Sequence, residues 1–173
     1  KEGAVPSYGS TVIYTTATVP NQPLAQNISE PLDLHGLVFT VNAGSFQLGG
    51  QTLRLSVDSP TISSDSPNNQ TISNPLDLAA DTTFAVNGTG NITLLGTVSG
   101  SGSFTKNGSG ELILASESNH SGDTLISDGV LALSESGQIL SSAIENNATF
   151  QILAGDHIIS NISGSGITQV LAG

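Results

Sequence analysis

The stretch GSGSFTKNGSGELIL, residues 100–114, holds the residue types in this chain that could most directly do chemistry. It places four glycines and Lys106 ahead of an apolar run. A glycine-rich loop with a lysine can bind phosphate, but a phosphate loop needs G-x-x-x-x-G-K-[ST] between a strand and a helix. Here Asn107 follows Lys106, and the next residues alternate like a strand, so no helix N-terminus is expected to face an anion. We therefore predict a tight turn between strands, with Lys106 lying against that turn and neutralising a nearby acid or carbonyl.

Metal chemistry has two further sets of candidates, the histidines and the acids that follow the glycine-rich stretch. The histidines are His35, His120 and His157. They are far apart in sequence and none sits in an H-x-x-H or H-E-x-x-H motif, so we expect exposed histidines in turns or on strand faces. The acids are Asp123, Asp128 and Glu135. Neither the calcium-binding nonapeptide G-G-x-G-x-D nor an EF-hand loop surrounds them, so they are predicted to be solvated. The sequence predicts no metal site and no cofactor.

Glycan cleavage is the enzyme activity to weigh for a chain of this composition. It needs converging carboxylates, usually with Arg or Lys, and aromatic platforms for sugar rings. Arg54 and Lys106 are isolated in the sequence, there is no Trp, and the acids fall mainly in turns. The G-x-S-x-G motif of serine hydrolases is also missing. We predict a chain without catalytic residues.

The charge balance excludes one large class of partners. Three Lys and Arg residues oppose 14 Asp and Glu residues, for a formal net charge of −11. Nucleic-acid binding needs clustered basic residues, and so does attraction to an anionic membrane surface. We therefore expect no nucleic-acid partner. The chain has no cysteine and opens with KEGAVPSYGS, without Met or a signal-peptide core, which reads as a processed piece of something longer.

The elements that must position these residues are short β-strands. Ala, Leu, Glu and Lys never recur with the helical period, whereas branched residues alternate with polar ones between clusters of Gly, Asn, Ser and Asp. We predict an all-β chain of about ten to fifteen strands. The segments expected to form strands are 11–19, 37–42, 45–57, 82–87, 91–98, 111–115, 123–126, 130–134, 148–153 and 157–162.

Internal repetition favours a solenoid over other all-β folds. ISEPLDLHGLVFTVNAG aligns with ISNPLDLAADTTFAVNGTG, with the Pro-Leu-Asp-Leu blocks 44 residues apart and Phe39 and Phe84 45 apart. Such a spacing fits two turns of a parallel β-helix of roughly 22 residues each. The narrow core of a solenoid, where Leu, Ile and Val stack from coil to coil, also explains the scarcity of aromatic residues. An antiparallel sandwich is the alternative, because it too has short strands at regular spacing.

The segment GSGSFTKNGSGELILASESNHSGDTLISDGVLAL, residues 100–133, resembles the passenger-associated transport repeat of Gram-negative autotransporters. Fourteen positions fit that motif without a gap. They are Gly100, Gly102, Phe104, Lys106, Gly108, Gly110, Leu112, Leu114, Gly122, Thr124, Ile126, Gly129, Leu131 and Leu133. The chain departs from the motif at His120, where the family has tyrosine, at Ser118, where it has asparagine, and at Ser116, where glycine is common.

The resemblance implies a right-handed parallel β-helix of about 7–8 coils within a secreted passenger domain. It carries no catalytic residues to transfer to this chain. Such passengers reach the cell surface through a C-terminal outer-membrane barrel, which lies outside this sequence. We expect two parts: residues 1–70, divergent N-terminal coils that could cap the solenoid or hold binding loops, and residues 71–173, the coils of the autotransporter repeat.

Three functions are compatible with these observations. The first is a non-catalytic stalk and adhesin at the Gram-negative cell surface, with a host-cell or matrix protein or glycan as partner. The second is an extracellular filament subunit that stacks end to end through the open edges of the solenoid. The third is a module that supports folding and export of a passenger whose activity lies elsewhere.

Overall fold

The computed structural model describes residues 8–15, 23–26, 31–140, 143–159 and 161–171. Within these ranges the chain is all-β, as predicted, and forms 21 strands and no helix. All strand pairs are parallel, in one sheet of 13 strands and another of eight. No described helix is long and apolar enough to cross a membrane. The predicted strand count was too low, because segments of two to four residues such as Leu76–Leu78 also pair.

Three strands make up each regular coil, and each belongs to one face of the solenoid. The 13-stranded sheet bends to form face 1 and face 2, and the eight-stranded sheet forms face 3. Face 1 contains β5 (Leu53–Leu55), β8 (Leu76–Leu78), β11 (Val98–Gly100), β14 (Glu117–Ser118) and β17 (Gln138–Ile139). Face 2 contains β1 (Ser10–Tyr14), β6 (Thr61–Ser64), β9 (Thr82–Val86), β12 (Phe104–Asn107), β15 (Thr124–Ile126), β18 (Ile144–Asn146) and β20 (Ile162–Ser163). Face 3 contains β2 (Pro23–Gln26), β4 (Gln47–Gly50), β7 (Gln70–Ile72), β10 (Ile92–Leu94), β13 (Glu111–Leu114), β16 (Val130–Leu133), β19 (Thr149–Ile152) and β21 (Ile167–Val170).

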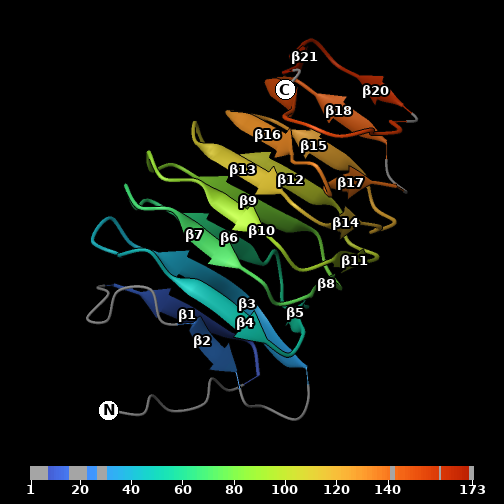
Figure 1. Ribbon diagram of the computed structural model, residues 1–173. Helices are drawn as coiled ribbons and strands as arrows, with labels where there is room; N and C mark the ends of the chain where they lie inside the picture. Colours follow the sequence, from blue (N-terminus) through green and yellow to red (C-terminus); the bar gives the residue numbers. More distant parts are fainter. Residues whose placement is uncertain (1–7, 16–22, 27–30, 141–142, 160, 172–173) are drawn as a thin grey trace.

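One long strand joins the first two faces. β3 (Leu32–Phe39) pairs with β5 through its first half and with β6 through its second half. Later coils divide this strand into two, with a short turn between them. Figure 1 shows the coils stacked in sequence order from the blue N-terminal end to the red C-terminal end. The result is a parallel β-solenoid of about 7 turns, so the predicted solenoid is confirmed and the antiparallel sandwich is excluded.

The core consists of columns of inward-facing side chains that continue from coil to coil. One column on face 1 runs through Leu32, Leu53, Leu76, Val98, Ser118 and Ile139. One on face 3 runs through Leu48, Ile72, Leu94, Leu114, Leu133, Ile152 and Val170. Neighbouring strands lie about 4.8 Å apart, so branched side chains of similar shape can stack closely along these two columns.

The predicted 44-residue repeat is confirmed for one block and wrong in register for the other. Leu32 pairs with Leu53 and Leu53 with Leu76, so the two Pro-Leu-Asp-Leu blocks are two coils apart. Two coils above Phe39, however, lies Val86 rather than Phe84. The continuous strand β3 lacks the turn residues that separate the two strands in the later coils. An alignment of the two sequences does not show how many such residues the later coils contain, so its register after the turn was wrong.

Several predicted strands differ in extent from the observed strands, and the predicted division of the chain into two parts is not tested. Segment 11–19 forms a strand only to Tyr14, and residues 16–19 lie outside the described part. Segment 157–162 was predicted as a strand, but among its described residues only Ile162 pairs. The division into residues 1–70 and 71–173 stays a prediction.

Candidate functional site

The glycines of the repeat motif lie where successive coils come closest. A Cβ added at any of these glycines would meet backbone of the preceding coil at less than 3.0 Å. The glycines are Gly100, Gly102, Gly108, Gly110, Gly122 and Gly129. A Cβ on Gly102, for example, would overlap the carbonyl oxygen of Ala80. These residues are glycine because any side chain would push two coils apart.

The apolar and threonine positions of the motif all face the core. Each is at most 1% exposed and belongs to a column of stacked residues. They are Phe104, Leu112, Leu114, Thr124, Ile126, Leu131 and Leu133. The aromatic ring of Phe104 also stacks on Phe84, with ring centroids 4.4 Å apart. The motif therefore describes the inner lining of two successive coils.

Lys106 occupies an inward-facing position in the middle of one of these columns. It pairs with Phe84 on the coil below and with Ile126 on the coil above, and its side chain is fully buried. Its ammonium group donates hydrogen bonds to the carbonyl oxygens of Asn107 (2.9 Å), Gly108 (2.6 Å) and Asp128 (3.1 Å). The predicted carbonyl contact is confirmed, and the structure adds that Lys106 reaches it from inside the solenoid.

Burial and the nearby acid act on Lys106 in opposite directions. Desolvation by burial lowers the pKa of Lys106 to about 8, and the charge of Asp128 opposes that shift. The three carbonyl bonds join two coils, since Asp128 lies one coil above Asn107 and Gly108. A buried cation is tolerated only where such hydrogen bonds replace its water. Lys106 therefore links two successive coils from inside the solenoid, at the corner between face 2 and face 3.

His120 contradicts the prediction that the histidines are exposed. It is 1% exposed, and its ring stacks near that of Phe104 with centroids 5.6 Å apart. Its Nδ1 is hydrogen-bonded to Ser118 Oγ at 2.9 Å, and its Nε2 to Thr124 Oγ1 at 3.1 Å. Burial lowers the pKa of His120. The prediction failed because hydroxyl partners that are two and four residues away satisfy both ring nitrogens inside the core.

The other candidates for metal chemistry lie apart from this coil or point to solvent. His35 is exposed. His157 is partly buried beside a shallow depression at the C-terminal end, and its Nε2 lies 2.6 Å from the Ala154 carbonyl oxygen. The acids Asp123, Asp128 and Glu135 are exposed. In the described ranges no group of three or more His, Asp or Glu side chains is placed to hold a metal ion.

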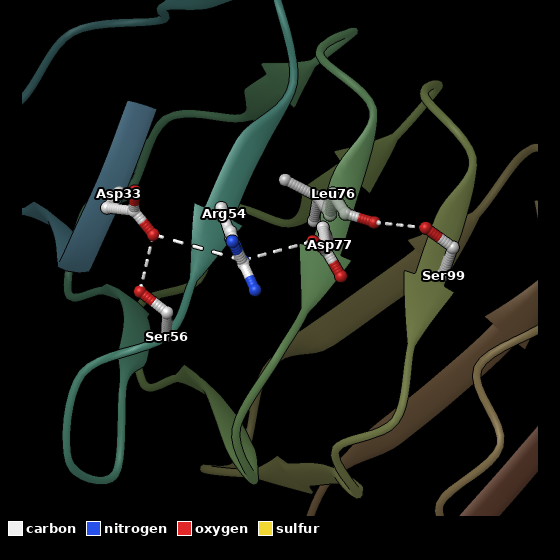
Figure 2. Close-up of polar contacts among 6 residues, drawn as sticks. All are labelled: Asp33, Arg54, Ser56, Leu76, Asp77 and Ser99. Atoms are coloured by element: carbon white, nitrogen blue, oxygen red, sulfur yellow. Dashed lines mark hydrogen bonds and ion pairs between the residues drawn. The ribbon is translucent and has the colours of Figure 1, made fainter. Parts of the chain in front are cut away.

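Arg54, which the sequence presented as isolated, lies between two carboxylates on the outer surface of face 1. Figure 2 shows Asp33, Arg54 and Asp77 on three successive strands. The Arg54 Nε lies 3.3 Å from Asp77 Oδ2 and 3.9 Å from Asp33 Oδ1, and Ser56 donates a hydrogen bond of 2.6 Å to Asp33. The assumption of isolation was wrong because residues about one coil apart in sequence become neighbours in space.

This charged row also continues as a polar ladder, yet it forms no enclosed site. The next strand contributes Ser99, whose hydroxyl donates to the Leu76 carbonyl oxygen at 3.3 Å, as Figure 2 shows. The Arg54 side chain is 49% exposed. Exposed ion pairs of this kind contribute only about 0.2 to 1 kcal/mol. The row therefore contributes modestly to the cohesion of three coils. Its coil-length spacing was the signal in the sequence that could have predicted it.

Comparison with known proteins supports the repeat and nothing else in the chain. A family model, the passenger-associated transport repeat, matches residues 104–133. No curated protein and no solved structure matches the chain. The matched range begins at Phe104 in β12 and ends at Leu133 in β16, so it covers parts of two successive coils, one with Lys106 and the next with His120.

The match and the geometry agree on the nature of this segment. Its glycines permit the close approach of coils, its apolar residues line the core, and its lysine links two successive coils through hydrogen bonds. Such repeats are structural parts of secreted or surface-exposed passengers, and a parallel solenoid fits a passenger stalk. Residues 104–133 match the passenger-associated transport repeat and fold as coils of a β-solenoid, as expected for a repeat of autotransporter passengers.

Proposed function

We propose that this chain is a non-catalytic stalk segment of an autotransporter-like passenger that stands at the Gram-negative cell surface and supports the folding and export of that passenger. The observation that carries the proposal is the repeat coil with Lys106 at its centre. Its ammonium joins two coils through carbonyl oxygens from both. A coil held in this way can serve as a template on which the next parallel strands form.

A parallel solenoid benefits from such a template because its contacts are between coils. Each coil contacts only its neighbours, so folding can begin at one stable coil and proceed along the axis. In this proposal the passenger emerges unfolded through an outer-membrane barrel, and the repeat coil is where its folding begins on the far side. The acidic surface keeps exported chains from associating with other acidic surfaces.

The experiment is surface display of the chain fused to an outer-membrane barrel. Lys106→Ala is compared with the matched variant Arg54→Ala, which removes the other described basic side chain from an exposed position. We expect Lys106→Ala to reduce the protease-resistant passenger on the cell surface, and Arg54→Ala to match the wild type. Equal display of all three proteins would contradict the export role.

Adhesion is the second part of this proposal, with a host-cell or matrix protein or glycan as partner. It rests on a rod whose outward residues are free for contact while its inward residues build the core. The test is binding of the purified chain to cells and matrix, followed by replacement of loops within residues 1–70. Binding that persists after every such replacement would place the contact elsewhere.

Self-assembly into filaments is an alternative, supported by the last coil. Ile162 and Val170 continue two core columns but are 38% and 69% exposed, because none of the described strands pairs with the outer edge of β20 or β21. A second copy could stack there through its own strand edges. Sedimentation of the purified chain over a concentration series tests this alternative, and a strict monomer at high concentration would exclude it.

A further inference from the structure

The corner beside Lys106 holds an asparagine whose side chain lies against the backbone of the next residue. Asn107 ends β12 and is exposed, and Gly108 follows in a left-handed conformation with φ of 79°. The Gly108 backbone nitrogen donates a hydrogen bond to Asn107 Oδ1 at 2.8 Å. This contact places the nitrogen next to the carbon of the side-chain amide, and glycine has no side chain to shield it.

We propose that Asn107 is a site of spontaneous covalent modification, where asparagine converts through a succinimide to isoaspartate and aspartate. The Gly108 nitrogen gives its proton to solvent and attacks Cγ of Asn107, which forms a carbon–nitrogen bond. The bond from Cγ to the side-chain nitrogen then breaks, and that nitrogen leaves with an added proton as ammonia. Water finally opens the ring at either carbonyl, so the net reaction consumes one water and releases one ammonia.

A second Asn-Gly pair in the same fold provides the contrast that makes the proposal specific. At Asn87–Gly88 the Gly88 nitrogen donates to the Ser64 carbonyl oxygen at 3.0 Å instead of facing its own asparagine side chain. The Asn87 side chain in turn donates from Nδ2 to Asp65 Oδ1 at 2.9 Å. Both reacting groups are therefore held apart by bonds to the coil below, and Asn87 must open locally before it can react.

The modification would disturb the hydrogen bonds by which Lys106 links two coils. Two of the three acceptors of its ammonium are the backbone oxygens of Asn107 and Gly108. Isoaspartate redirects the main chain through Cβ, which adds an atom to the backbone at this corner and moves both oxygens. The reaction also adds a carboxylate beside the exposed Asp128. We expect modified molecules to unfold at lower denaturant concentration than unmodified ones.

The experiment follows both asparagines in one sample of the native full-length chain. The protein is incubated at mildly alkaline pH, unfolded, and cut with trypsin at mildly acidic pH. Cleavage after Arg54 and Lys106 places Asn87 in fragment 55–106 and Asn107 in fragment 107–173. Fragmentation mass spectrometry locates the replacement of amide nitrogen by oxygen, and an isoaspartyl methyltransferase labels the isoaspartate. We expect Asn107 to convert roughly tenfold faster than Asn87, the factor set by breaking the hydrogen bond that holds Gly88.

Two controls connect the rate difference to the fold. In concentrated denaturant the two asparagines should convert at similar rates, because both pairs have the same sequence and neither is held. Asn107→Gln should abolish the product at residue 107, since the larger ring forms far more slowly, while conversion at Asn87 continues. Equal rates in the native protein, a faster Asn87, or no conversion at Asn107 would each overturn the proposal.

Discussion

Two regions of this solenoid place a basic side chain on a strand in opposite ways. Within the repeat, Lys106 points inward between Phe84 and Ile126 and is fully buried. In the coils before it, Arg54 points outward between Asp33 and Asp77, with 49% of its side chain exposed. Successive residues on a strand face opposite sides, so a shift of one residue decides which of these environments a charge meets.

The comparison shows that a positive charge contributes to stability through different interactions in the two regions. Lys106 loses its water and instead donates hydrogen bonds to three carbonyl oxygens, while its hydrocarbon stem fills a core column. Arg54 keeps much of its water, so its attraction to the two aspartates is screened. The inward lysine therefore affects the stability of the solenoid, and the outward arginine affects it little.

Of the changes considered, removal of each basic side chain should produce the largest difference in the free energy of unfolding between the two regions. Lys106→Ala should lower the free energy of unfolding by about 3 kcal/mol, because the stem leaves a cavity between Phe84 and Ile126. The loss of three hydrogen bonds and the relief of burying a charge largely offset each other. Arg54→Ala should cost less than about 1 kcal/mol. Chemical denaturation measures both, and a similar cost for the two variants would contradict the comparison.

Adding a methyl group at a glycine tests how much stability depends on the close approach of successive coils at that residue. Gly102→Ala should cost about 2 kcal/mol, since its Cβ overlaps the carbonyl oxygen of Ala80. The matched variant is Gly49→Ala before the repeat, where the nearest atom to the new Cβ is the Ser73 Cβ at 3.9 Å. That variant should lie within about 0.5 kcal/mol of the wild type. Thermal unfolding of the two proteins gives the difference, and its absence would show that the coils can separate at little cost.

The protonation of Lys106 predicts how stability changes in alkali. The folded pKa is about 8 and the ordinary value is 10.5, so the unfolded chain binds more protons between them. The free energy of unfolding should therefore rise by about 2 kcal/mol from pH 8 to pH 10. Above that range the trend should reverse, because burial raises the pKa of Tyr14 to about 12. Lys106→Met keeps the stem without the charge, and its stability should lack the rise; an identical rise in that variant would assign the effect to another group.

His120 predicts a smaller change in acid, confined to the repeat. Burial holds its pKa below the ordinary 6.5, so the unfolded chain takes up the proton first as the pH falls. Stability should decrease below pH 6.5, by at most about 1.4 kcal/mol for each pH unit. His120→Gln should remove this component. An acid dependence that persists unchanged in His120→Gln would assign the effect to another group.

Much of the candidate site could be predicted from the residues themselves. The glycines of the repeat mark close approaches of the backbone, and alternating apolar residues such as Leu112 and Leu114 mark the core. What the sequence could not give is the pairing between coils. Whether Phe39 lies two coils below Phe84 or below Val86 depends on how many turn residues the later coils insert, and the spacing of residues along the chain does not fix that number.

The class of fold and the position of the repeat could be predicted from local properties of the chain: its branched residues, its turn residues and its coil-length periodicity. The tertiary structure alone decided that Lys106 and His120 are inside, that Arg54 has two aspartates beside it, and that Asn107 and Asn87 differ. These outcomes depend on which side of a strand a residue faces and on what the adjacent coil places against it. Contacts between coils join residues some 22 positions apart, and only the stacked backbone fixes their register.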